Sequence, residues 1–84
     1  MVLHKGDADA GTILVVALDR DGLGTLYERL PDPAGLRRWV AVRNQDRTAL
    51  GEFDQYLDRR KQLDRDVWIV ELTIAEVERS ILNT

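Results

Sequence analysis

Residues 12–18, TILVVAL, form the stretch that decides the fold of this chain. Successive side chains of a strand point to opposite faces of a sheet, and in this stretch apolar residues occupy both sets of alternate positions. A strand that is apolar on both faces is normally covered on both faces. The stretch therefore predicts a strand at the centre of a sheet.

Four further segments are predicted as strands around this one: 2–5, 25–30, 37–42 and 67–72. The aspartate–glycine sequence DRDGLG (19–24) predicts a tight turn after the central strand. PDPAG (31–35) interrupts the chain before 37–42, because proline lacks a backbone donor and restricts the residue before it. We expect the first four strands to form an antiparallel meander, with GDADAG (6–11) as the first connection.

The spacing of apolar residues changes to a helical one between residues 48 and 63. One side of this helix would carry Ala49, Leu50, Phe53, Tyr56, Leu57 and Leu63. Further on, Thr73 and Glu76 have the spacing of a capping box, which predicts a short C-terminal helix over 74–82. The sequence therefore predicts a single α+β domain over 1–84, with a small, mainly antiparallel sheet of four to five strands and two helices.

The composition excludes several classes of protein. Twelve basic and 15 acidic residues give a net charge of −3, which argues against a dedicated nucleic-acid binder because such proteins normally carry a basic field. The absence of cysteine excludes disulfides and thiolate metal sites. The longest apolar run, Ile13 to Leu18, is far shorter than the ~20 residues that span a bilayer. We expect a soluble cytoplasmic protein without a membrane segment.

Two acidic turns, Asp7-Ala-Asp9 and Asp19-Arg-Asp21, are the first candidates for a binding site. A calcium loop of the EF-hand type requires a glutamate at its twelfth position, but counting from Asp7 or Asp19 places a leucine there. Aspartate and glycine are also the residues that turns prefer. We interpret both segments as turns and predict no resident metal or cofactor. A weak metal-dependent or anion site at Asp7 and Asp9 is the open alternative.

Arg37, Arg38 and Trp39 form the second candidate, and Arg43 and Arg47 follow closely. Arginine beside an exposed tryptophan can stack on a base or bind a phosphate or carboxylate. The alternative is structural, because alternation in a strand would turn Trp39 into the sheet face and leave Arg38 in water.

No catalytic residue can be assigned. His4 is the only histidine and Ser80 the only serine, and Ser80 falls in the predicted C-terminal helix. Trp68 is expected in the core. Glu71 shares a strand face with buried residues, so it needs a partner, for which Arg38 is a candidate.

The chain resembles the bacterial domain-of-unknown-function family 1491. The resemblance lies in the segment KGDADAG (5–11) before the apolar strand, the helix that ends near residue 63, the turn DRD (64–66), and the strand with Trp68 and Glu71. It implies a small bacterial cytoplasmic protein and no established activity. Members usually begin with an additional helix, which this chain is expected to lack, and Arg65 stands where the family often has proline. Without that helix, part of the sheet would be left uncovered.

Three functions remain open at this stage. The first is a non-catalytic interaction module that binds an unknown protein or a second copy of itself, because the sheet is apolar on both faces in a short chain. The second is a binder of nucleic acid or an acidic ligand through Arg37, Arg38 and Trp39. The third is an enzyme or metal protein that uses Asp7 and Asp9. We rank them in this order.

Overall fold

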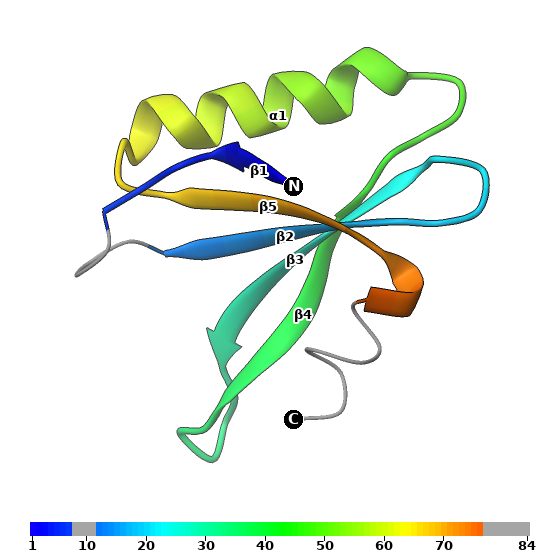
Figure 1. Ribbon diagram of the computed structural model, residues 1–84. Helices are drawn as coiled ribbons and strands as arrows, with labels where there is room; N and C mark the ends of the chain where they lie inside the picture. Colours follow the sequence, from blue (N-terminus) through cyan, green and yellow to red (C-terminus); the bar gives the residue numbers. More distant parts are fainter. Residues whose placement is uncertain (8–11, 77–84) are drawn as a thin grey trace.

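The computed structural model describes residues 1–7 and 12–76, which form one sheet with a helix on one of its faces (Figure 1). The strands are β1 (Val2–His4), β2 (Ile13–Leu18), β3 (Gly24–Pro31), β4 (Arg37–Asn44) and β5 (Trp68–Thr73). The helix α1 (Leu50–Leu63) connects β4 to β5. These elements confirm the predicted α+β class.

The order of strands in the sheet is β1-β5-β2-β3-β4, with β2 at the centre as predicted. Only β2, β3 and β4 form the expected antiparallel meander, because β5 lies between β1 and β2. β5 runs parallel to β2 and antiparallel to β1. The prediction that β1 adjoins β2 is therefore wrong. A parallel partner for β2 requires a crossover, and α1 supplies it.

The β3–β4 hairpin is longer than the strand beside it. β2 pairs with β3 only from Gly24 to Glu28, whereas β4 pairs with β3 as far as Pro31. The end of the hairpin therefore extends beyond β2 and away from the rest of the sheet (Figure 1). A bulge between Leu26 and Tyr27 adds a residue to β4 at this point of the ladder and increases the local twist.

The main core lies between α1 and the sheet. The sheet contributes Leu14 and Val16 of β2, Leu26 of β3, Ile69 of β5 and Val67 just before β5. The helix contributes Phe53 and Leu57. Phe53 packs closely against Gly24, where an added methyl group would crowd the ring. The helical spacing of Phe53 and Leu57 places both on the face that contacts the sheet.

The opposite face of the sheet holds a smaller cluster around Val15 and Ala17, each 2% exposed. Tyr27, Trp39 and Leu72 pack against it and are half-buried. The prediction that β2 buries both of its faces therefore holds for the middle of the strand. Ile13, at its start, is 49% exposed.

The helix is shorter than predicted and buries a narrower stripe. It begins at Leu50, after Ala49, which makes no side-chain cap. Leu50 and Leu63 are 48% and 85% exposed, so the apolar side predicted for the helix is not buried at its two ends. Both lie in the terminal turns of α1, beyond the part of the helix that Phe53 and Leu57 hold against the sheet.

Two tight turns of the meander share the sequence Asp-x-x-Gly-Leu and the same hydrogen bonds. In the first, Asp19 Oδ1 accepts from the N–H groups of Asp21 and Leu23, and in the second, Asp32 Oδ1 accepts from those of Ala34 and Leu36. The glycines, Gly22 and Gly35, have φ of 79° and 85°, a region that other residues enter only at a cost. The shared pattern of residue types is visible in the sequence at 19–23 and 32–36.

One of the two hydrogen bonds of the predicted capping box is present at the end of β5, and the carboxylate of Glu76 binds the hydroxyl of Thr73 in place of its N–H. Thr73 Oγ1 accepts from the N–H of Glu76 at 3.3 Å and donates to its carboxylate at 3.1 Å. Residues 74–76 form a helical turn, and the rest of the predicted helix over 74–82 lies outside the described residues.

Candidate functional site

The predicted arginine–tryptophan site on β4 is divided between the two faces of the sheet. Trp39 packs with Val15 and Ala17 on the face away from α1. Alternation places Arg37 on the same face and Arg38 on the other. The structure therefore does not bring Arg37 and Arg38 together with Trp39 as one binding site.

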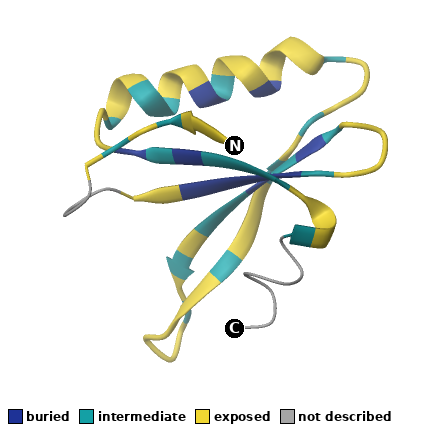
Figure 2. Cartoon of the chain, in the orientation of Figure 1, coloured by how far each residue is buried: buried dark blue, intermediate teal, exposed yellow. Residues whose placement is uncertain are grey.

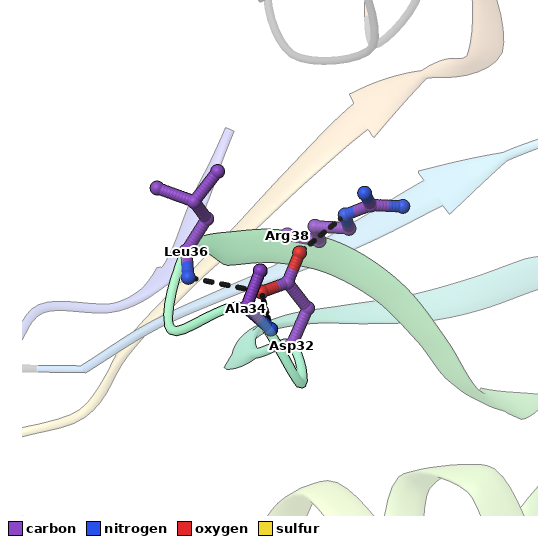
Figure 3. Close-up of polar contacts among 4 residues, drawn as sticks. All are labelled: Asp32, Ala34, Leu36 and Arg38. Carbon is purple, nitrogen blue, oxygen red and sulfur yellow. Dashed lines mark hydrogen bonds and ion pairs between the residues drawn. The ribbon is translucent and has the colours of Figure 1, made fainter.

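Arg38 is occupied by the turn that precedes β4 (Figure 3). Its Nε donates to Asp32 Oδ2 at 2.9 Å, and the other oxygen of this carboxylate holds the turn. The Asp32 side chain is only 10% exposed, whereas that of Arg38 is 72% exposed. Arg38 therefore binds a carboxylate that also stabilises the turn. The predicted pairing of Arg38 with Glu71 is wrong.

Arg43 and Arg47, which were predicted to extend the same positive surface, also have other contacts. The guanidinium of Arg43 lies 4.5 Å from the ring centre of Tyr56, an arrangement typical of a cation–π contact. Arg47 donates to Asp21 at 3.0 Å on the exposed surface. Each arginine thus binds a different element of the protein.

A polar cluster that sequence inspection missed connects α1 to the hairpin. Arg60 donates to both carboxylate oxygens of Glu28, at 2.8 and 3.2 Å, and to the hydroxyl of Tyr56 at 3.3 Å. The hydrogen bonds to Glu28 raise the pKa of Arg60 above its ordinary value, while burial opposes this effect. A permanently charged arginine and a carboxylate that it holds do not supply a nucleophile or a base, so the cluster is structural.

Arg29 is another residue that the sequence did not single out. It lies directly opposite Trp39 in the β3–β4 ladder. Arg37 lies opposite Pro31, two residues further along the ladder and therefore on the same face. Among residues 1–7 and 12–76, neither Arg29 nor Arg37 has a carboxylate within ion-pairing distance. We call Arg29, Arg37 and Trp39 the hairpin patch. Only knowledge of the strand register could have revealed it.

The segment around Asp7 is attached to the start of β5. The N–H of Asp7 donates to the carbonyl of Asp66 at 3.1 Å, and its own carbonyl accepts from the indole of Trp68 at 3.0 Å. Gly6 approaches the Asp66 carbonyl so closely that a Cβ atom would clash with it. These contacts hold the backbone of this segment against the start of β5. Asp9 lies outside the described residues.

A hollow of about 200 Å³ lies between β1 and α1. His4 is half-buried at its wall and donates from Nδ1 to the carbonyl of Val67 at 2.7 Å, which leaves Nε2 as the acceptor in the neutral ring. Lys61 is held by Asp58 at 3.0 Å on the helix side. The lining residues include no serine, threonine or cysteine whose hydroxyl or thiol His4 could activate.

Within the described part of the chain, no three histidine, cysteine or carboxylate side chains lie together in a way that could hold a metal ion. The same residues include no helix that is both long and apolar enough to cross a membrane.

Comparison with known proteins identifies the family. The family model described as "Protein of unknown function (DUF1491)" matches residues 1–82. The chain belongs to the DUF1491 family. Comparison of this DUF1491 chain with curated proteins gave no match.

Solved structures of DUF1491 proteins have the same fold. The crystal structure of a DUF1491 family protein from Caulobacter crescentus CB15 is 38% identical, with a TM-score of 0.69, over 84% of this chain and 65% of that one. The NMR structure from the same organism gives 38% identity and a TM-score of 0.63, over 84% and 64% of the two chains. This DUF1491 chain therefore spans about two thirds of the length of these relatives.

A third solved structure is more distant in sequence. The solution structure of protein Atu0922 from A. tumefaciens is 28% identical, with a TM-score of 0.61, over 87% of this chain and 67% of that one.

Proposed function

We propose that this DUF1491 chain is a small, non-catalytic protein-interaction module of the bacterial cytoplasm, and that its contact surface is the outer edge of β4. The observation that carries the proposal is the exposure of this edge. β4 is the last strand of the sheet, and no strand of the described residues pairs with its outer side. Six of its eight residues are exposed, so exposed colour runs along most of the strand (Figure 2).

An unpaired edge strand presents a row of backbone donors and acceptors to which another chain can add. Proteins protect such edges by making them short, by covering them, or with charged residues and bulges. β4 has three arginines and a bulge, but it is one of the two longest strands of the described sheet. Val40 and Val42 are 40% and 36% exposed on it, which adds apolar surface to the backbone groups. The opposite edge, β1, has only three residues and offers much less.

The proposal is tested by crosslinking in the bacterium that encodes the protein. A photoreactive benzoylphenylalanine replaces Val42 in one variant and Gln55, an exposed residue of α1, in a matched variant. We expect a covalent adduct with a second protein chain from position 42 and none from position 55. Equal adducts from both positions, or none from position 42, would contradict the proposed surface. Light scattering of the purified protein then distinguishes a second copy from a different partner.

A further inference from the structure

We propose that the partner of β4 is an acidic segment of another protein, which binds in extended form as an additional strand with a carboxylate on Arg37, while Arg29 adds positive charge on the same face. The inference rests on the interaction function proposed above and names the chemistry of the partner. It is carried by two independent features of the hairpin: the direction of its backbone groups and the unneutralised charge of the hairpin patch.

The backbone groups that face outward can be assigned from the turn. The N–H of Asp32 donates to the carbonyl of Leu36, and bonded pairs alternate along an antiparallel ladder. Counting in steps of two from Leu36, Arg38 and Val40 direct their backbone N–H and C=O groups toward β3. Arg37, Trp39 and Ala41 direct theirs away from it, so an added strand would meet three successive donor and acceptor pairs.

The side chains beside these groups are positive, and among the described residues they form no ion pair. Four other arginines of this region are occupied by the protein itself: Arg38 by Asp32, Arg47 by Asp21, Arg60 by Glu28 and Arg43 by Tyr56. Arg29 and Arg37 are exposed and have no carboxylate partner among the described residues. A residue of an added strand directly opposite Arg37 would have its Cβ roughly 5 Å away, within reach for an ion pair.

A second copy of the chain fits this edge poorly. β4 has three arginines and no acidic residue, so pairing of two β4 strands would bring like charges together and would offer no carboxylate to Arg37. A carboxylate opposite Arg37 is attracted instead. Charge complementarity therefore favours a different, acidic partner.

Nucleic acid also fits less well than an acidic protein segment. Single-stranded binding relies on exposed aromatic rings on which successive bases stack, but Trp39 is half-buried against Val15 and Ala17. A short acidic strand needs only the backbone of β4 and the positive charge of Arg37 and Arg29 for binding.

The test uses the ¹⁵N-labelled protein and peptides of the length of β4, eight residues. One peptide alternates glutamate and threonine, and its counterpart has lysine in place of every glutamate. We expect the glutamate peptide to shift the amide resonances of residues 37–44 at low salt, whereas the lysine peptide leaves them unchanged. Arg37→Glu should weaken binding of the glutamate peptide by about fivefold to tenfold. Arg59→Glu, at an exposed position of α1, is the matched control and should have little effect.

Backbone pairing is tested on the peptide, so that the protein fold is untouched. A glutamate peptide that is N-methylated at every residue keeps its charge but has no N–H donor on either edge, and it should no longer bind. Unchanged binding would overturn strand addition.

The remaining outcomes separate the two proposals. Equal shifts of residues 37–44 by both peptides would overturn the acidic partner while leaving β4 as the interface. If the glutamate peptide shifts only resonances outside residues 37–44, or none, the proposal of an acidic strand is overturned. The crosslinking experiment then decides independently whether β4 is the interface. Shifts of residues 37–44 by an eight-nucleotide oligo-dT but not by the glutamate peptide would overturn the inference in favour of single-stranded nucleic acid.

Discussion

Arg60 of α1 and Glu28 of β3 form a bidentate ion pair that joins the helix to the hairpin, 32 residues apart in the chain. Their side chains are 22% and 17% exposed, so the pair is better shielded from water than an ordinary surface ion pair. The pair positions the β3–β4 hairpin, on which the proposed interface lies.

Replacing this arginine by lysine should destabilise the protein. Arg60→Lys retains the charge but loses the planar fork that binds both carboxylate oxygens. We expect the free energy of unfolding in urea to fall by about 1–2 kcal/mol. The control is Arg59→Lys at the neighbouring exposed position, which should change it by less than about 0.5 kcal/mol. Equal effects of the two substitutions would show that the bidentate geometry contributes nothing.

Gly6 and Gly51 should respond to alanine in opposite directions. A Cβ at Gly6 would clash with the backbone carbonyl of Asp66, whereas nothing lies within 4 Å of a Cβ at Gly51. Gly6→Ala should lower the free energy of unfolding by about 2 kcal/mol or more. Gly51→Ala should raise it by up to ~1 kcal/mol, because alanine favours the helix. Thermal and urea unfolding measure both, and a stable Gly6→Ala variant would contradict the close approach.

The two Asp-x-x-Gly-Leu turns should differ in their sensitivity. Asp19→Ala removes the acceptor for two backbone N–H groups and should cost about 1 kcal/mol of unfolding free energy. Asp32→Ala removes the same acceptor and also releases Arg38, so it should cost about 1–2 kcal/mol. Asp21→Ala breaks only an exposed pair with Arg47 and serves as the control. An equal cost for Asp19→Ala and Asp32→Ala would show that Arg38 adds nothing.

Asp46 should titrate below the ordinary range for aspartate. The N–H of Thr48 and, to a lesser extent, its hydroxyl donate to this carboxylate and lower its pKa. Because the folded pKa lies below the unfolded one, the stabilisation is present above the unfolded pKa and is lost as pH falls through the folded pKa.

Carboxyl-carbon NMR measures this titration directly. In Thr48→Ala the hydroxyl is gone but the backbone donor stays, so the pKa of Asp46 should rise only part of the way to its ordinary value. A complete return would mean that the hydroxyl, and not the N–H, dominates.

Local features were predictable because neighbouring residues encode them. The apolar residues of 12–18 placed β2 at the centre of the sheet, and the helical spacing of Phe53 and Leu57 placed them in the core. The capping box of Thr73 and Glu76 was likewise present in the sequence. In each case a few consecutive residues supply both the hydrogen bonds and the pattern of burial.

The position of β5 and the hairpin patch depended on tertiary structure. Nothing within β5 distinguishes a place between β1 and β2 from one at an edge, because strand order is decided by which arrangement buries most apolar surface under α1. The separation of Arg37 from Arg38, and the pairing of Arg29 with Trp39, follow from a register set across the sheet. The sequence by itself thus determined the elements and their turns, whereas long-range packing decided which charged side chains meet each other and which remain exposed to a partner.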